Sequence, residues 1–144
     1  MEFLFSTKFL KIAITSAILF VILDFLWLAV IASNWYRQTL GYLAELDPQG
    51  KIVFNIPFGL IAQFAISLAL TAVIMMALQM DNRLVVAIAW GTFIGLAIYT
   101  TYDFTNLSFV KGWPLWISLL DVIWGTTQGA MAGVYMFYLN RYFS

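Results

Sequence analysis

Long apolar runs, separated by short polar stretches, dominate this chain and predict helices that cross a membrane. A bilayer core about 30 Å thick requires about 20 mostly apolar residues in a helix. Four segments reach that length, and we expect helices at about residues 9–33, 52–79, 84–106 and 115–138. The pattern therefore predicts an all-α fold, an antiparallel four-helix bundle integral to the membrane, with residues 1–144 forming a single domain.

The polar stretches predict how these helices are joined. The segment NWYRQTLGYLAELDPQGK is charged and contains Pro48, so we expect it outside the hydrocarbon, with a short interfacial helix between the first two spans. The MDNR segment is short enough to predict a tight antiparallel hairpin between the second and third spans. Pro114 suits the first turn of the last helix.

Composition agrees with a membrane protein and excludes several classes of function. The chain is 63% hydrophobic and 10% charged, whereas a soluble domain is roughly 45–50% apolar. Seven basic and seven acidic residues leave no basic stripe, so we expect no nucleic-acid partner. Without Cys or His there is no disulfide, thiolate nucleophile, ordinary zinc site or histidine-based triad. We expect no metal and no cofactor, because no loop has the dense acidic spacing of an ion cage.

Basic residues near the predicted helix ends indicate the orientation of the chain. They favour the cytoplasmic side, and two lysines precede the first helix, so we predict a multi-pass protein with both termini in the cytoplasm. Aromatic residues at the helix ends, Trp35 and Tyr36 among them, are predicted to lie at the membrane interface. The basic residues divide into Lys8, Lys11, Arg83 and Arg141 at one end and Arg37, Lys51 and Lys111 at the other.

Three aspartates within or at the ends of the apolar runs are the candidate catalytic residues, namely Asp24, Asp103 and Asp121. An ionised carboxylate is costly in hydrocarbon, so such residues usually face a protein interior or a wet cavity. At 1.5 Å of rise per residue, all three are predicted to lie in the same outer half of the membrane. The alternatives are a hydrated interfacial position for Asp103 and purely structural interhelical bonds for the other two.

Other polar and aromatic residues are predicted to complete this site. The echo between LDFLWL and LDVIWG places a Trp three residues after an Asp in the first and last helices, on one helical face. An indole at this spacing can donate its N–H to a carboxylate or form an apolar wall beside it. The predicted substrate-binding residues are Trp27, Trp124, Asn55, Tyr99, Asn106 and Gln128.

Glycines spaced four residues apart predict close helix contacts. Gly91 and Gly95 form one stripe, and Gly125, Gly129 and Gly133 form another. Small residues at this spacing let helix backbones approach closely in lipid. The stripes predict either packing within one chain or a homodimer through one of them.

The strings ILDFLWL, YDFTNLSFVKGWP and LLDVIWG occur in this order along the chain. Together they resemble the small bacterial membrane proteins of the domain of unknown function 2177 family, and the likeness covers nearly the whole chain. Its most specific part runs from Tyr102 to Pro114. Family members typically have a Gly soon after the first Asp-x-x-Trp, where this chain has Leu28 and Ala29. The resemblance implies a four-helix protein of a bacterial inner (cytoplasmic) membrane and supplies no activity.

These observations leave three hypotheses for the function. In the first, the carboxylates line a pocket that binds or acts on a lipid or amphiphilic small molecule, with Asp24 and Asp121 as an acid–base pair. In the second, the protein is a small proton-coupled carrier that works as a dimer. In the third, it is a structural or assembly factor whose polar residues only hold the helices together. The sequence does not decide whether the protein is an enzyme.

Overall fold

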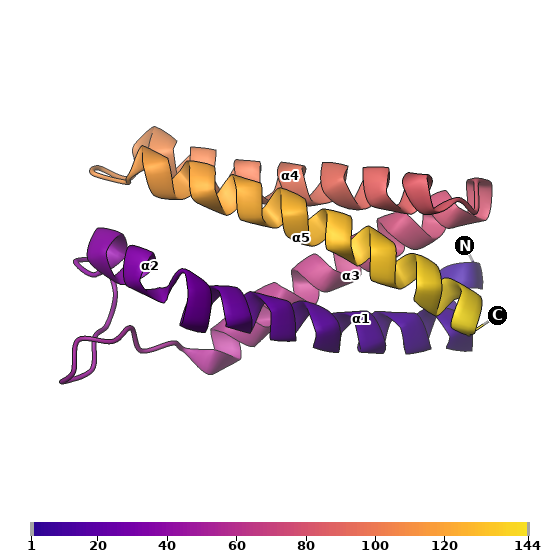
Figure 1. Ribbon diagram of the computed structural model, residues 1–144, viewed down its shortest axis with the longest axis horizontal. Coiled ribbons are helices and arrows are strands. Elements are labelled where there is room, and N and C mark those ends of the chain that lie inside the picture. The colour runs from indigo at the N-terminus through magenta and orange to yellow at the C-terminus, as the bar shows by residue number, and fades with distance from the viewer. Residues whose placement is uncertain (1, 144) are drawn as a thin grey trace.

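The computed structural model describes residues 2–143, and within them every named element is helical, as predicted (Figure 1). The helices differ greatly in length. In chain order they are the 3-10 turn η1 (Glu2–Phe5), α1 (Thr7–Phe25), the π-helical η2 (Leu26–Ile31), α2 (Ser33–Leu40), α3 (Ile56–Met80), α4 (Leu84–Phe109) and α5 (Leu115–Tyr142).

Three stretches of helix among residues 2–143 are long and apolar enough to cross a membrane, namely Thr7–Ile31, Ile56–Met80 and Leu84–Phe109. They correspond to the first three predicted spans. The fourth predicted span corresponds to α5, which is longer but falls outside this group. Its polar residues Asp121, Gln128 and Asn140 lower its mean hydropathy relative to the other three.

The long helices run back and forth between two ends of the molecule (Figure 1). Both chain termini lie at one end, and α2 with its following loop lies at the other. Helices α4 and α5 are antiparallel and lie side by side, while α3 packs against both α1 and α4. We call the end that carries α2 the far end, because it lies farthest from the termini.

The glycine stripes explain why α4 and α5 lie so close together. A Cβ atom on Gly91 would lie 2.1 Å from the carbonyl oxygen of Gly129, and one on Gly95 would lie 2.2 Å from that of Gly125. Likewise, a Cβ on Gly133 would lie 2.3 Å from the carbonyl oxygen of Ala87. The stripes thus pack on each other within one chain, and the surface that a homodimer would need at these glycines is already occupied.

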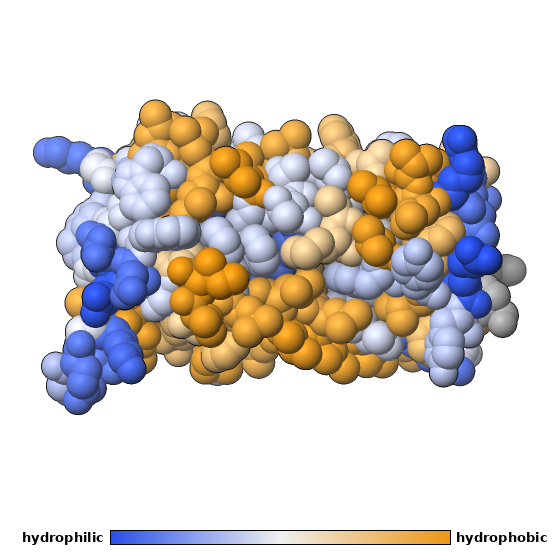
Figure 2. Space-filling model, viewed as in Figure 1, coloured by the Kyte–Doolittle hydropathy of each residue, from blue (hydrophilic) through white to orange (hydrophobic). Residues whose placement is uncertain are grey.

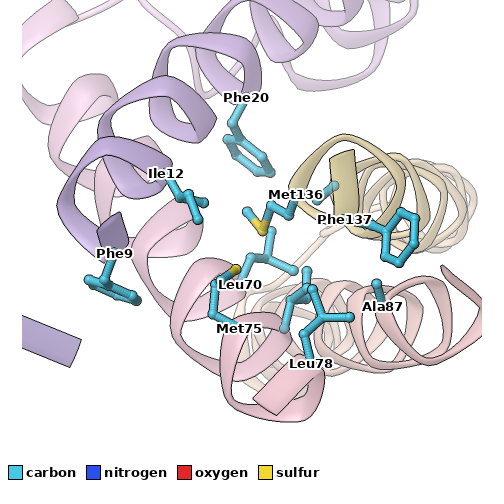
Figure 3. Close-up of a cluster of buried hydrophobic side chains, with 11 residues drawn as sticks. Phe9, Ile12, Phe20, Leu70, Met75, Leu78, Ala87, Met136 and Phe137 are labelled. Carbon is cyan, nitrogen blue, oxygen red and sulfur yellow. The ribbon is translucent and has the colours of Figure 1, made fainter. Parts of the chain in front are cut away.

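An apolar core fills the half of the molecule near the termini (Figure 3). It draws side chains from every long helix, including Phe20 of α1, Leu70 of α3, Ala87 of α4 and Met136 of α5. The outward faces of the helices are apolar as well, and Figure 2 shows this surface bounded by hydrophilic residues at both ends. This distribution is the one expected of a protein surrounded by lipid.

At the far end, the structure differs from the prediction at the beginning of α3. Helix α3 begins at Ile56 rather than near residue 52, because Ile52 forms an antiparallel bridge with Leu46 instead. The short helix predicted between the first two spans is α2, which begins directly after η2 and ends at Leu40. It also turns Tyr36 inward: that side chain is only 9% exposed and packs within the protein.

Candidate functional site

A cavity of about 420 Å³ lies at the far end of the molecule, and all three aspartates line it. Asp24 comes from α1, Asp103 from the last turns of α4 and Asp121 from the second turn of α5. Antiparallel connections bring them to one level, because α1 and α4 end where α5 begins. The remaining lining residues are Leu28, Tyr36, Ala62, Gln63, Ile66, Ile98, Tyr99, Tyr102 and Trp124.

Asp24 is buried, and both of its carboxylate oxygens accept hydrogen bonds from other helices. The indole Nε1 of Trp124 donates to Oδ1 over 3.0 Å. The amide Nε2 of Gln63 donates to Oδ2. This carboxylate therefore joins α1 to α3 and α5. Because each of its oxygens accepts a hydrogen bond, the buried group is not left without partners.

Asp121 is half-buried and is held by a residue that the sequence pattern did not identify. The hydroxyl of Tyr36 in α2 donates to its Oδ1. The same hydroxyl accepts a hydrogen bond of 3.2 Å from the indole Nε1 of Trp27. Helix α2 thus contributes Tyr36 to the wall of the cavity.

The two tryptophans of the sequence echo meet face to face between α1 and α5. The ring centroids of Trp27 and Trp124 are 4.5 Å apart and the ring planes differ by 5°. Each indole serves the aspartate of the other echo, since Trp124 bonds Asp24 directly and Trp27 reaches Asp121 through Tyr36. The echo therefore encodes reciprocal contacts between two helices rather than pairs within one helix.

Asp103 differs from the other two aspartates. Its side chain is 0% exposed, and within residues 2–143 neither of its carboxylate oxygens has a hydrogen-bond partner. The indole of Trp113 donates to the hydroxyl of Ser118 over 2.9 Å, and both of these side chains lie beside Asp103. An acidic group that is buried without partners is costly in a folded protein, which makes it a candidate for contact with a ligand.

Tyr99 and Gln128 extend the polar groups from the cavity towards the middle of the molecule. The Tyr99 hydroxyl, from the wall of the cavity, donates to Oε1 of Gln128 over 3.0 Å. Gln128 is 0% exposed, and its Nε2 donates to the carbonyl oxygen of Phe20 over 3.4 Å. Gln128 therefore holds the lining residue Tyr99 and does not itself line the cavity.

The structure leaves four of the six predicted binding residues outside the lining of this cavity, namely Trp27, Gln128, Asn55 and Asn106. Asn55 is exposed and precedes α3, because that helix starts later than predicted. Asn106 lies one turn beyond Asp103, and its side-chain nitrogen is buried without a hydrogen-bond partner among the described residues. Conversely, Tyr36, Gln63 and Tyr102 line the cavity although they were not predicted as site residues. Gln63 could have been identified from the sequence, because it is a polar amide within an otherwise apolar run.

A second, smaller cavity of about 140 Å³ adjoins the first between α1 and the beginning of α3. Asp24, Leu28 and Gln63 line both cavities, so these three side chains form the wall between them. The other lining residues are mostly apolar and several face outward, including Phe25, which is 62% exposed. We call this second cavity the α1–α3 groove.

The π-helical geometry of η2 explains part of this arrangement. Its wider helical turn, in which the amide of Ala32 donates to the carbonyl oxygen of Trp27 over 2.7 Å, shifts the residues after Phe25 from the register of α1. Such π-helical turns occur frequently at functional sites. Here the turn contains Trp27 and Leu28, one beside the cavity wall and one within it.

The three carboxylates share the cavity without forming one compact cluster. Among residues 2–143, no three acidic side chains come together as a metal-binding group. Catalytic roles for these aspartates remain predictions, since their geometry defines a place for a ligand and no reaction.

Comparison with known proteins identifies a family for this chain, and the description of that family names no activity. A family model described as "Predicted membrane protein (DUF2177)" matches residues 9–138, in agreement with the resemblance inferred from the sequence. No curated protein and no solved structure matches the chain.

Proposed function

The chain belongs to the DUF2177 family of predicted membrane proteins, and we propose that it binds a membrane lipid or another amphiphilic small molecule in the cavity at its far end. The observation that carries this proposal is the meeting of three carboxylates, from three helices, in one cavity of about 420 Å³. Cavities of this size commonly hold small ligands, whose apolar parts contact apolar walls and whose polar groups meet a few fixed polar side chains.

We further propose that α5 is a fourth membrane span. It is 28 residues long, more than the roughly 20 that a bilayer core requires, and it packs along α4. Its polar residues Asp121, Gln128 and Asn140 are half-buried or buried rather than exposed. With four spans and both termini in the cytoplasm of a bacterial inner membrane, the cavity lies in the outer half of the bilayer.

The hydrogen bonds favour binding over acid–base catalysis by the predicted pair. Both oxygens of Asp24 accept hydrogen bonds, and Asp121 accepts one from Tyr36. A general acid or base needs a free path for its proton to the substrate. Asp103 keeps two free oxygens and is better placed to hold a polar group of the ligand.

The α1–α3 groove supports an amphiphile rather than a wholly polar ligand. It adjoins the polar cavity and is lined mainly by apolar residues that face outward, where lipid would surround the protein. A ligand with its polar end among the carboxylates would extend its chain along this groove into the bilayer. Leu28 lies at the junction of the two spaces.

Photolabelling in lipid nanodiscs tests this proposal. The protein would be exposed in turn to diazirine-bearing forms of a fatty acid, a fatty alcohol, a fatty amine and phosphatidylcholine, and labelled peptides would be mapped by mass spectrometry. We expect at least one probe to label residues of the cavity and groove. Leu28→Trp should reduce that labelling several-fold by filling the junction, whereas Leu26→Trp, on the exposed side of the same segment, should not. Labelling confined to outward-facing residues and unchanged by Leu28→Trp would contradict the proposal.

A proton-coupled carrier is the second candidate, and one observation favours it. Three residues with hydroxyl groups are completely buried between Gln128 and the end of the molecule near the termini, namely Ser16, Ser67 and Thr71. Buried hydroxyls could relay protons from the cavity towards the other side of the membrane. Proton flux into proteoliposomes that is abolished by Asp24→Asn would support this candidate, and the absence of flux would favour simple binding.

A further inference from the structure

Asp103 is the only one of the three cavity aspartates whose oxygens both lack a partner among residues 2–143. It is 0% exposed and lines the cavity, so a ligand in that space can supply donors to its oxygens. Within this fold, the other two carboxylates are already bonded by Trp124, Gln63 and Tyr36. A ligand therefore completes the hydrogen bonds of the site best if it presents donors to Asp103.

The rest of the cavity wall favours a positive charge. Four of its side chains are aromatic, namely Tyr36, Tyr99, Tyr102 and Trp124. Aromatic faces attract cations, and the attraction is stronger where water is excluded. Among the described residues that line the cavity, none is Lys or Arg. Carboxylates without a basic residue beside them attract cations and repel anions.

We propose that the ligand carries an alkylammonium group, which binds in the cavity with its N–H groups directed at Asp103. This inference rests on the proposed function and names the chemical class of the polar group. A protonated primary amine brings three N–H donors, enough to satisfy both free oxygens of Asp103. A quaternary ammonium brings the charge without donors, and an alcohol brings a donor without the charge. Of these three groups, a primary ammonium should therefore bind to the site with the highest affinity.

Calorimetric titration in dodecyl maltoside micelles at pH 7 tests this ranking. The four probes are dodecylamine, dodecyltrimethylammonium, dodecanol and dodecanoate, and ethylamine serves as a soluble amine without a chain. Dodecylamine is protonated at this pH, since simple amines titrate near the lysine value of about 10. A charge-assisted hydrogen bond corresponds to about a tenfold to hundredfold gain in affinity. We expect dodecylamine to bind at least about tenfold more tightly than each of the other probes.

Two conservative variants locate the effect. Asp103→Asn keeps the size of the side chain and removes its charge, so it should abolish the preference for dodecylamine over dodecanol. Asp81→Asn changes an exposed aspartate of the hairpin between α3 and α4, outside the cavity, and should leave every affinity unchanged. If Asp103→Asn does not fold, the ranking of the probes on the unmodified protein still decides the question.

The outcomes separate this inference from the proposed function. If dodecanol or dodecanoate binds as tightly as dodecylamine, the ammonium inference is wrong and amphiphile binding stands. If dodecylamine keeps its advantage in Asp103→Asn, the assignment to Asp103 is overturned. Ethylamine binding as tightly as dodecylamine would keep the ammonium site and refute the membrane amphiphile as its source. Binding of none of the probes would refute both.

Discussion

The two halves of the helical assembly differ in what fills the space between the helices. Near the termini, apolar side chains such as Phe20, Leu70 and Met136 are completely or almost completely buried and form a packed core (Figure 3). At the far end, the helices enclose a cavity lined by three carboxylates, and one of these, Asp103, has no partner among the described residues. The same helices form both halves.

This difference separates the part of the chain that holds the fold from the part that is free to bind. In lipid, helices associate through close packing and hydrogen bonds rather than through release of water, so the glycine contacts of α4 and α5 carry much of the stability. The far end forgoes dense packing and instead uses a few cross-helix hydrogen bonds to hold its walls. An unpartnered buried carboxylate there costs stability, as is common at functional sites.

The largest expected effect concerns the packed contact between α4 and α5. In Gly129→Val the new Cβ would lie 2.2 Å from the carbonyl oxygen of Gly91, so the helices must separate, at a cost of about 3 kcal/mol. Gly59→Val is the matched control, because a Cβ there meets nothing within 4 Å. Unfolding in mixed micelles, followed by tryptophan fluorescence, measures both. Equal destabilisation by the two variants would show that this contact does not hold the fold.

The next effect concerns Asp24 at the far end. Asp24→Ala leaves the donors of Trp124 and Gln63 without an acceptor, and each buried donor costs about 1–3 kcal/mol, so we expect a loss of about 2–4 kcal/mol. Asp24→Asn keeps an acceptor for Trp124, and the amide of Gln63 can turn its oxygen towards the new amide. It should therefore lose less than about 1 kcal/mol on the same scale. If the two variants unfold alike, these bonds do not support the wall of the cavity.

A smaller effect is expected at α2. Tyr36→Phe removes the hydroxyl that joins Trp27 to Asp121, which should cost about 1–2 kcal/mol. It should also change the fluorescence of the stacked tryptophans. Tyr42→Phe removes one hydrogen bond to the carbonyl oxygen of Gly112 on the exposed side, at a cost below about 0.5 kcal/mol. A larger loss from Tyr42→Phe would mean that the exposed loop, not the cavity, positions α2.

The smallest effect concerns the hairpin at the end near the termini. The hydrogen bond and charge of Arg83 lower the pKa of Asp81 below 3.8, the ordinary value. An aspartate with a lowered pKa stabilises the fold above its unfolded pKa, and this contribution is lost as the pH falls through about 4 and below. Arg83→Gln should return the pKa of Asp81 towards 3.8, as measured by carboxyl NMR titration in micelles. Because the pair is exposed, the effect on stability should be slight. An unchanged pKa would show that the pair is not formed in solution.

Much of this fold follows from local patterns in the sequence. Apolar runs of sufficient length predict α1, α3 and α4, and the spacing of Gly91 and Gly95 opposite Gly125 and Gly129 predicts close contact between helices. The turn at η2 could not be predicted, because LWLAVI contains no Pro or Gly to mark a change of helix type. Where α3 begins depended on pairing between Leu46 and Ile52, a contact that periodicity does not record.

The sequence predicted which aspartates meet in the candidate site, but it did not predict which residues donate hydrogen bonds to them. Depth along each helix placed Asp24, Asp103 and Asp121 at one level, and the structure finds all three around one cavity. Which donors bond them depends on how the helices are rotated against each other. For that reason Trp124 bonds Asp24 on another helix, and Tyr36, which resembles an interfacial aromatic residue in sequence, is directed inward to Asp121.

The central claim is that the three aspartates surround a space that holds the polar end of a membrane amphiphile. A structure of the protein in lipid nanodiscs, prepared from native membranes without added ligand, tests it most directly. We expect elongated non-protein density whose polar end lies within hydrogen-bonding distance of Asp103 and whose chain follows the α1–α3 groove past Leu28. A structure in which protein side chains fill the space, or in which the three carboxylates face separate surfaces, would contradict the claim.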